Sequence, residues 1–210
     1  KKPFPSTKDL YPGSYIASIA NEIIKKKIIS SFKSFEKISD ILTKESLNFS
    51  MRLIQSDLSL LGIKHDSFVH ESEFVKNDSV SKIIKYLEKK NYIYLGTLAA
   101  PKGGSNFDLK EKGKQLLFRS SEFGDDLDRP LKKSDGTWTY FATDIAYHEN
   151  KVNRNFDFLI NILGADHSGY TKRITSAVRA LSKDKTILTC KVCQLVKLFK
   201  SGQPFKMSKR

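Results

Sequence analysis

Hydrophobic residues recur every three or four positions in three stretches of the first ninety residues, which predicts three amphipathic helices. The predicted helices cover residues 14–29, residues 46–61 and the residues that follow Asp78. In the third helix, Val80, Ile83, Ile84 and Leu87 follow the i, i+3, i+4, i+7 spacing of one buried face. Gly62 ends the second helix, and residues 63–73 are predicted to form a strand and a loop.

The pattern changes after Asn91. Between residues 92 and 136, short β-prone pieces alternate with glycines, which indicates a small β-rich insertion. Beyond it we expect strands at residues 138–142, 158–163 and 190–199, and a helix that begins near Tyr170. Alternating strands and helices favour a parallel sheet with right-handed crossovers. The sequence therefore predicts an α/β fold in which a doubly wound parallel sheet is interrupted by the insertion.

Composition narrows the class of protein. Of the 210 residues, 39% are hydrophobic and two are cysteines, and no apolar stretch approaches the ~20 residues of a membrane span. The first residues carry no hydrophobic signal core. This composition excludes a disulfide scaffold and indicates a soluble intracellular protein in a reducing compartment.

The chain is strongly basic. It has 37 Lys and Arg against 23 Asp and Glu, and its formal net charge is +14. An excess of positive charge favours a polyanionic partner such as RNA or DNA. The alternative is a general richness in lysine, with many of these side chains on the solvated faces of helices. Charge alone leaves both interpretations open.

The most distinctive motif is Lys206-Met207-Ser208-Lys209, close to the end of the chain. Two lysines three positions apart after a strand form a compact cationic loop. Their ammonium groups suit phosphate oxygens whose negative charge grows during nucleotidyl transfer. The alternative interpretation is an ordinary basic tail in a lysine-rich chain.

A second candidate segment, Gly164 to Tyr170, follows the apolar strand and opens a helix, where doubly wound folds bind their ligands. Gly164 allows a ligand to approach the backbone, and Asp166 can accept hydrogen bonds from ribose hydroxyls. The simpler interpretation is a turn in which Asp166 caps the helix.

A third candidate pair is Tyr140 and Asp144, four residues apart at the expected junction of a strand and a helix. A carboxylate with a nearby phenol suits a planar guanidinium, which a carboxylate binds through two hydrogen bonds. The simpler interpretation of this pair is that Asp144 caps the helix and Tyr140 lies at the edge of the core. No metal site is predicted, because the four histidines are scattered and Cys190 and Cys193 have no second cysteine pair.

Taken in order, these motifs resemble those of arginyl-tRNA synthetases, which are class I aminoacyl-tRNA synthetases. The resemblance rests on Tyr11–Ile16, Leu61–Asp66, Glu71-Ser72, Phe118–Ser120, Gly124–Leu131, Lys133–Gly136, Tyr140–His148, Gly164–His167 and Lys206–Lys209. It implies a Rossmann-like nucleotide-binding domain split by a connective insertion. On this basis we expect residues 1–91 to belong to the first half of the catalytic domain, 92–136 to the insertion and 137–210 to the second half.

The resemblance also implies a reaction and roles for single residues. Family members make arginyl-adenylate from ATP and L-arginine and transfer the arginine to the terminal adenosine of tRNA(Arg). The expected catalytic residues are Lys206 and Lys209, with Gly164, Asp166, His167, Met207 and Ser208 at the ATP and Tyr140 and Asp144 at the arginine. Magnesium would accompany the ATP, and no tightly bound cofactor is expected. A cytoplasmic monomer is usual in the family.

The chain also departs from the family pattern. It contains no His-x-Gly-His element, and the family's tRNA-binding and anticodon-binding domains have no counterpart in these residues. We therefore expect an excerpt of a catalytic domain that is inactive alone. A non-catalytic RNA-binding module derived from a class I synthetase is the alternative. A synthetase for glutamate or glutamine is disfavoured because it would need a cationic pocket, whereas position 144 is acidic.

Overall fold

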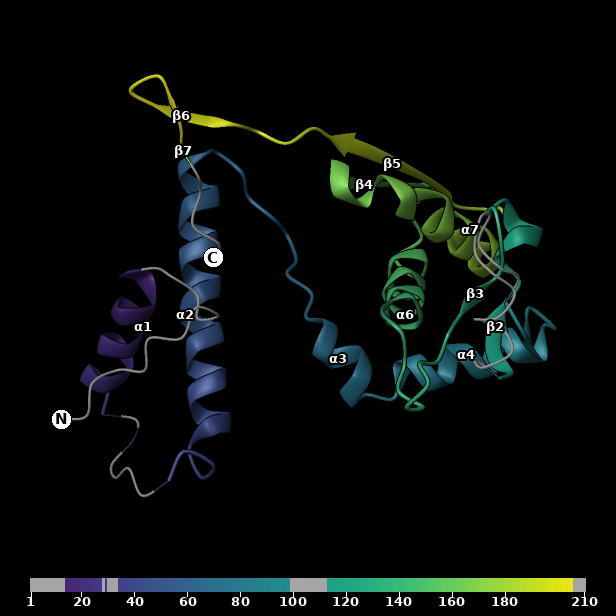
Figure 1. Ribbon diagram of the computed structural model, residues 1–210, viewed down its shortest axis with the longest axis horizontal. Coiled ribbons are helices and arrows are strands. Elements are labelled where there is room, and N and C mark those ends of the chain that lie inside the picture. The colour runs from purple at the N-terminus through teal and green to yellow at the C-terminus, as the bar shows by residue number, and fades with distance from the viewer. Residues whose placement is uncertain (1–13, 28, 30–33, 99–112, 206–210) are drawn as a thin grey trace. The chain divides into compact units, whose positions relative to one another are not determined.

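The computed structural model describes residues 14–27, 29, 34–98 and 113–205. Figure 1 shows their helices and strands, coloured by position along the chain. These residues belong to two units. The smaller unit contains the residues up to Phe68 and those from Lys197 onward, and the larger unit runs from Val69 to Val196. The candidate site lies in the larger unit.

Two helices and a hairpin make up the described part of the smaller unit. Its elements are α1 (Ser14–Lys25), α2 (Ser39–Leu60), β6 (Leu198–Lys200) and β7 (Gln203–Phe205). α1 packs against α2, and Ile19 and Ile23 are the buried residues of α1. Ser201 and Gly202 join the two strands with φ values of 51° and 73°. Positive φ at both central residues is what a tight type I′ hairpin turn requires.

Four helices and five strands make up the described part of the larger unit. Its elements, with two short 3₁₀ turns, are α3 (Glu71–Lys76), α4 (Ser79–Lys89), β1 (Ile93–Gly96), β2 (Gln115–Phe118), η1 (Ser120–Phe123), β3 (Arg129–Pro130), α6 (Tyr140–Val152), β4 (Phe158–Gly164), η2 (Ala165–Tyr170), α7 (Thr171–Ser182) and β5 (Ile187–Cys193). One hydrophobic cluster connects them. Leu87, Phe118, Ile145 and Ile174 in this cluster are at most 1% exposed, so α4, α6, α7 and β2 share one core.

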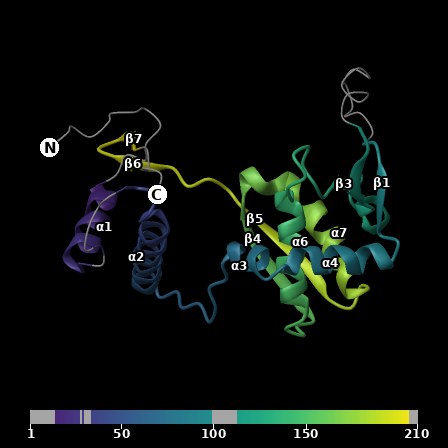
Figure 2. The same ribbon diagram turned by 90° about the horizontal axis from the view of Figure 1, so that it is seen from below.

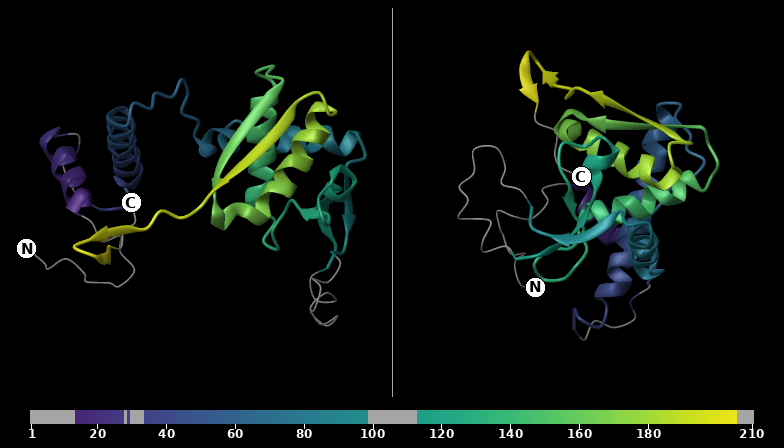
Figure 3. Two further views of the ribbon diagram at one scale, coloured as in Figure 1. Left: turned by 90° about the horizontal axis from the view of Figure 1, so that it is seen from above. Right: turned by 90° about the vertical axis from the view of Figure 1, so that its right-hand side faces the viewer.

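β4 and β5 form a parallel pair, visible as adjacent arrows in Figure 3. α7 connects them and packs against β5. Leu159 and Leu188 are buried, whereas Ile160 and Ile162 on the alternate positions of β4 are 64% and 65% exposed. Two parallel strands joined by a helix form a β-α-β unit, the element from which Rossmann-like sheets are built. The predicted α/β fold class is confirmed.

β1, β2 and β3 form a separate antiparallel sheet, which stands at the end of α4 in Figure 2. All three strands lie within the segment that the sequence predicted to be β-rich. Leu117 and Phe118 on β2 are completely buried, and Leu131 after β3 is buried with them. Consecutive residues of a strand point to opposite faces of the sheet, so both faces of β2 are covered here, and Phe118 and Leu131 belong to the core shared with α4, α6 and α7.

Several predicted boundaries are wrong. A strand was predicted at residues 138–142, but α6 begins at Tyr140 because the Thr139 side chain accepts a hydrogen bond from the Ala142 amide and caps the helix. α2 begins at Ser39, earlier than predicted, and α1 ends at Lys25 rather than at residue 29. The short helix α3 replaces the end of the strand and loop predicted over residues 63–73.

The turn after η1 joins the antiparallel sheet to α7. The guanidinium of Arg179 on α7 donates a hydrogen bond from Nη1 to the Phe123 carbonyl at 2.9 Å. Gly124 has a φ of +100°, and a Cβ there would lie only 3.0 Å from Arg179 Nη1. Asp125 is 8% exposed and accepts hydrogen bonds from Nε and Nη2 of Arg129 at 2.7 and 2.8 Å. Burial alone would raise the pKa of Asp125, but hydrogen bonds from Arg129 and the Asp126 amide lower it.

Two adjacent aspartates allow a matched test of this turn. Asp125→Asn should lower the free energy of unfolding by about 2–3 kcal/mol, because it leaves Arg129 without its charged partner. Asp126→Asn removes an exposed pair with Lys172 and should cost less than about 1 kcal/mol. Urea unfolding, followed by the fluorescence of the single tryptophan, Trp138, measures both values.

The pH dependence supplies the control for that test. Because the pKa of Asp125 is lowered in the folded protein, its contribution to stability is present above its unfolded pKa and is lost as the pH falls through its folded pKa. The Asp125→Asn variant should lack this acidic loss, whereas the Asp126→Asn variant should retain it. Equal costs for the two substitutions would contradict the assigned role of Asp125.

Candidate active site

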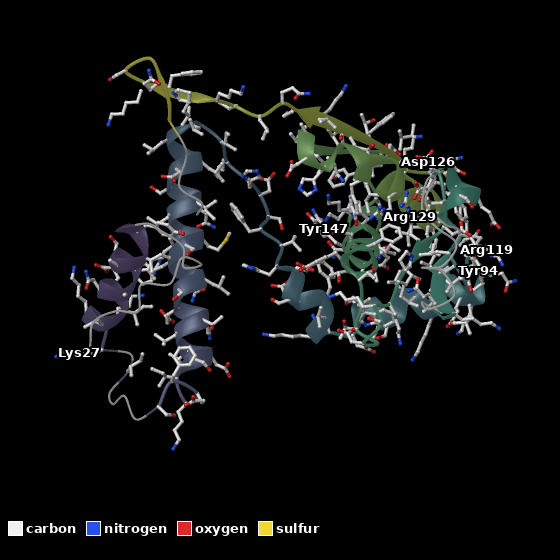
Figure 4. All side chains as sticks on the ribbon, viewed as in Figure 1. Lys27, Tyr94, Arg119, Asp126, Arg129 and Tyr147 are labelled. Carbon is white, nitrogen blue, oxygen red and sulfur yellow. The ribbon has the colours of Figure 1, made fainter. Side chains whose placement is uncertain are left out.

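A cavity of about 380 Å³ lies alongside β4, a size within the range of ligand pockets. Its lining comes from α6, β4, η2 and α7 and comprises Asp144, Tyr147, His148, Lys151, Ile160, Asn161, Ile162, Leu163, His167, Tyr170 and Ile174. Figure 4 labels Tyr147, which belongs to the α6 side of the cavity. A few polar groups among apolar side chains are typical of a site that orients a small molecule.

Asp144 is the acidic residue of this cavity, and it is half-buried. The Tyr170 hydroxyl donates a hydrogen bond to its Oδ2 atom. Its Oδ1 atom accepts no hydrogen bond from the residues that the structure describes. Burial raises the pKa of Asp144, and it raises that of Tyr170 as well, so the phenol keeps its proton and acts as the donor. The arrangement leaves one carboxylate oxygen free to accept a hydrogen bond from a ligand.

Behind Asp144, three side chains form a hydrogen-bonded series. Lys151 Nζ donates to Asn161 Oδ1 at 2.8 Å, and Asn161 Nδ2 lies 2.9 Å from His148 Nε2. His148 Nδ1 lies 2.8 Å from the backbone carbonyl oxygen of Asp144. His148 is 4% exposed, and burial lowers its pKa to about 4. Burial also lowers the pKa of Lys151, whose ammonium lies 4.4 Å from the centroid of the Tyr147 ring.

Tyr140, predicted beside Asp144, has a different environment. It is 75% exposed, and Lys133 Nζ lies 5.5 Å from its ring centroid. Both residues lie on α6 four positions apart, which places them on one side of the helix. Tyr140 is absent from the lining of the cavity, and the phenol in contact with Asp144 is that of Tyr170.

Gly164, Asp166 and His167 lie together where β4 ends and η2 begins. His167 lines the cavity, and its Nε2 atom is 3.6 Å from Asp166 Oδ2. Both side chains are largely exposed. A Cβ at Gly164 would lie 2.5 Å from Asp166 Oδ1, so the absence of a side chain lets this carboxylate lie close to the backbone.

The predicted phosphate loop, Lys206 to Lys209, lies outside the described residues, and so do Met207 and Ser208. Among the residues that are described, no three His, Cys, Asp or Glu side chains are grouped as metal ligands. Within the same residues, the search for a helix with the length and hydropathy of a membrane span found none.

Sequence patterns assigned no role to four polar residues of the cavity, His148, Lys151, Asn161 and Tyr170, although His148 and Tyr170 end two of the segments that these patterns singled out. Asn161 carried a signal, since it is the single polar residue in the apolar stretch Phe158–Leu163. A polar side chain there needs a buried partner. His148 and Lys151 are three positions apart on α6, a spacing that places them near one another but does not reveal that both turn toward β4.

The chain matches the family model of class I (R) tRNA synthetases, catalytic domain, over residues 1–209. It is 56% identical over 202 residues to the arginine–tRNA ligase of Pelagibacter ubique (strain HTCC1062), a match that covers 96% of this chain. It is 46% identical over 206 residues to the arginine–tRNA ligase of Ruegeria pomeroyi (strain ATCC 700808 / DSM 15171 / DSS-3), covering 95% of this chain. These matches cover 35% and 34% of the two relatives, so the chain spans about a third of their length.

One solved structure agrees with this family, and a second supports the fold. A protein of Campylobacter jejuni described as an arginyl-tRNA synthetase superposes with a TM-score of 0.76 at 31% identity, over 99% of this chain and 42% of that one. Arginyl-tRNA synthetase from Plasmodium falciparum superposes with a TM-score of 0.56 at 18% identity, over 89% and 31% of the two chains, which supports the fold alone. Because the family model matches residues 1–209 of the 210-residue chain, this chain belongs to the catalytic-domain family of the class I (R) tRNA synthetases.

Proposed function

We propose that this chain is part of an arginine–tRNA ligase and that the cavity beside β4 binds the arginine side chain. The observation that carries the proposal is the half-buried carboxylate of Asp144, which lines the cavity and has one oxygen without a donor among the described residues. Relatives named arginine–tRNA ligase support it. A carboxylate of this kind is complementary to a guanidinium, the group that distinguishes arginine from the other amino acids.

The residues around Asp144 can divide the recognition of arginine between them. The Tyr170 hydroxyl holds Oδ2 and so limits the rotation of the carboxylate. Oδ1 is then available to the N–H groups of the guanidinium. Tyr140, one helical turn earlier and exposed, would contact the substrate at the mouth of the site. The apolar residues Ile162 and Leu163 suit the methylene groups of the arginine stem.

The ATP is proposed to lie at the end of β4. Gly164 would allow the nucleotide to approach the backbone, and Asp166 and His167 would accept or donate hydrogen bonds to its ribose. The arginine carboxylate attacks the α-phosphorus of ATP, a new P–O bond forms, and pyrophosphate leaves. Lys209, assisted by Lys206, would stabilise the negative charge of the leaving pyrophosphate. Met207 and Ser208 complete this loop, and Mg²⁺ bound to the ATP would neutralise part of the phosphate charge.

The arginine is then transferred to the 3′ adenosine of tRNA(Arg), whose hydroxyl replaces AMP on the arginyl carbonyl. The net charge of +14 supports an RNA partner. We further propose a monomeric enzyme in the cytoplasm. Residues 1–91 and 137–210 would be the two parts of the catalytic domain, with residues 92–136 as the connective insertion.

The first prediction from this proposed function concerns Asp144. In the full reading frame, Asp144→Asn should lower arginine-dependent ATP–pyrophosphate exchange, measured with tRNA present, by at least ~100-fold, because the guanidinium loses its charged acceptor. Asp157→Asn, an exposed aspartate just before β4, is the matched control and should change the rate less than twofold.

Two other outcomes of this assay would count against the proposal. Unchanged exchange in the Asp144→Asn variant would contradict the assigned arginine pocket. Absence of exchange in the unaltered protein, together with tRNA binding that weakens steeply with salt, would favour the non-catalytic RNA-binding module.

The second prediction separates the two tyrosines. Tyr170→Phe should raise the KM for arginine about tenfold, because Asp144 loses the hydroxyl that orients it. Tyr140→Phe should raise it less than threefold, since the Tyr140 ring remains and its hydroxyl is not bonded to Asp144. Steady-state exchange at varied arginine concentration gives both values. A larger effect from Tyr140→Phe would assign the orienting phenol to Tyr140 instead.

The third prediction concerns the phosphate loop. Lys209→Ala should lower kcat of exchange by at least ~100-fold with little change in the KM for arginine, because the lysine acts on the leaving pyrophosphate. Lys200→Ala in β6 removes an exposed lysine nearby in the sequence and should leave kcat within twofold. Equal effects of the two substitutions would refute a specific role for Lys209.

A further inference from the structure

The hydrogen-bonded series behind Asp144 has only one self-consistent arrangement of protons. A backbone carbonyl only accepts, so His148 Nδ1 must carry the proton that it shares with the Asp144 carbonyl oxygen. At the other end, the Lys151 ammonium only donates, so it faces the oxygen of the Asn161 amide. The NH₂ group of Asn161 therefore faces His148 Nε2, which must accept and carries no proton.

The two ends thus fix the same state of the ring, a neutral imidazole protonated at Nδ1. The surroundings agree with this state, because His148 is 4% exposed and its pKa is lowered by burial. An imidazolium would need an acceptor at Nε2, and the amide presents a donor there. Lys151 makes this orientation of the amide the favoured one, since a flipped amide would set its NH₂ group against the ammonium.

We propose that Lys151 and Asn161 are positioning residues that act through His148, by holding its ring neutral and bonded to the backbone of Asp144. This inference rests on the proposed function, in which Asp144 binds the guanidinium of arginine. Two consequences follow for that carboxylate. The turn of α6 that carries it gains a side-chain anchor, and no imidazolium stands one turn away to compete with the substrate cation.

The series also controls the position of the lysine itself. The Lys151 ammonium is held by Asn161 Oδ1 and by the face of the Tyr147 ring. Both contacts fix the ammonium in the cavity that it shares with Asp144, where its charge lowers the pKa of that carboxyl. A cationic substrate is therefore recognised in a cavity whose own histidine and lysine are both constrained.

Asn161→Asp tests the proposal because it replaces the donor at His148 Nε2 by an acceptor. The full-length protein, labelled with ¹⁵N-histidine, should show His148 protonated only at Nδ1 at pH 6.5 before the substitution. In the variant the ring should be protonated at Nε2 as well, with its pKa raised by about two units or more. Asn155→Asp introduces the same charge at an exposed position after α6 and should leave the His148 signals unchanged.

Kinetics of the same proteins supply a second readout. The KM for arginine in the Asn161→Asp variant should rise about tenfold as the pH falls through the new pKa of His148, because an imidazolium then repels the guanidinium. The KM for ATP should change less than twofold. The other titratable groups around His148 are Asp144, Tyr147 and Lys151 of α6, His167 and Tyr170 of η2, and Cys190 of β5. The Asn155→Asp variant retains all of them and so provides the background pH profile.

These experiments test the positioning role of Asn161 and Lys151 separately from the proposed binding of arginine. The ring-nitrogen signals need no substrate, so an unchanged tautomer and pKa in Asn161→Asp would overturn the positioning role whatever the enzyme activates. A changed tautomer with an unchanged KM for arginine would also overturn it. If Asn161→Asp does not fold, Lys151→Met serves instead. Without the ammonium the amide can turn its oxygen to His148 Nε2, so the pKa of His148 should rise while the neutral ring keeps its proton on Nδ1. An unchanged pKa would refute the proposal.

Discussion

A carboxylate that is partly removed from water is stable in its charged form only where donors or cations compensate for the lost hydration, and Asp144 occupies such a position. The Tyr170 hydroxyl compensates one oxygen. The other oxygen has no hydrogen-bond donor among the described residues, although the charges of Lys151 and His167 lower the pKa of the carboxyl. This oxygen therefore requires a hydrogen-bond donor, which water or a ligand can supply. The rest of the site is arranged around this requirement.

Three local features of the fold bring the residues of the candidate site together. Thr139 caps α6 and so fixes where the helix begins, which sets the positions of Asp144, His148 and Lys151 along it. β4 runs beside this helix and contributes Asn161, while η2 at its end contributes His167 and Tyr170. The ends of parallel strands are the usual place for ligands in α/β folds, and the candidate site lies beside and beyond such a strand.

The sequence predicted the class of fold because hydrophobic periodicity reports burial directly, as it does for α4. It singled out the segment Gly164–His167 and Asp144 as candidate site residues, because local motifs carry that information. It misplaced the start of α6, where the β-prone residues of 138–142 were outweighed by the Thr139 cap. It could not pair Tyr170 with Asp144, because those residues are brought together only by the packing of η2 against α6. Asn161 was visible as a polar residue in an apolar strand, but its partners come from a helix that the strand meets only in three dimensions.

The central claim is that the charge of Asp144 selects a guanidinium. Citrulline replaces the guanidinium of arginine by a neutral urea of nearly the same shape, so the ratio of kcat/KM for the two amino acids isolates the contribution of charge. The account predicts that the unaltered full-length enzyme prefers arginine by at least ~100-fold and that Asp144→Asn reduces this preference to within about tenfold. An undiminished preference for arginine in the Asp144→Asn variant would contradict the account.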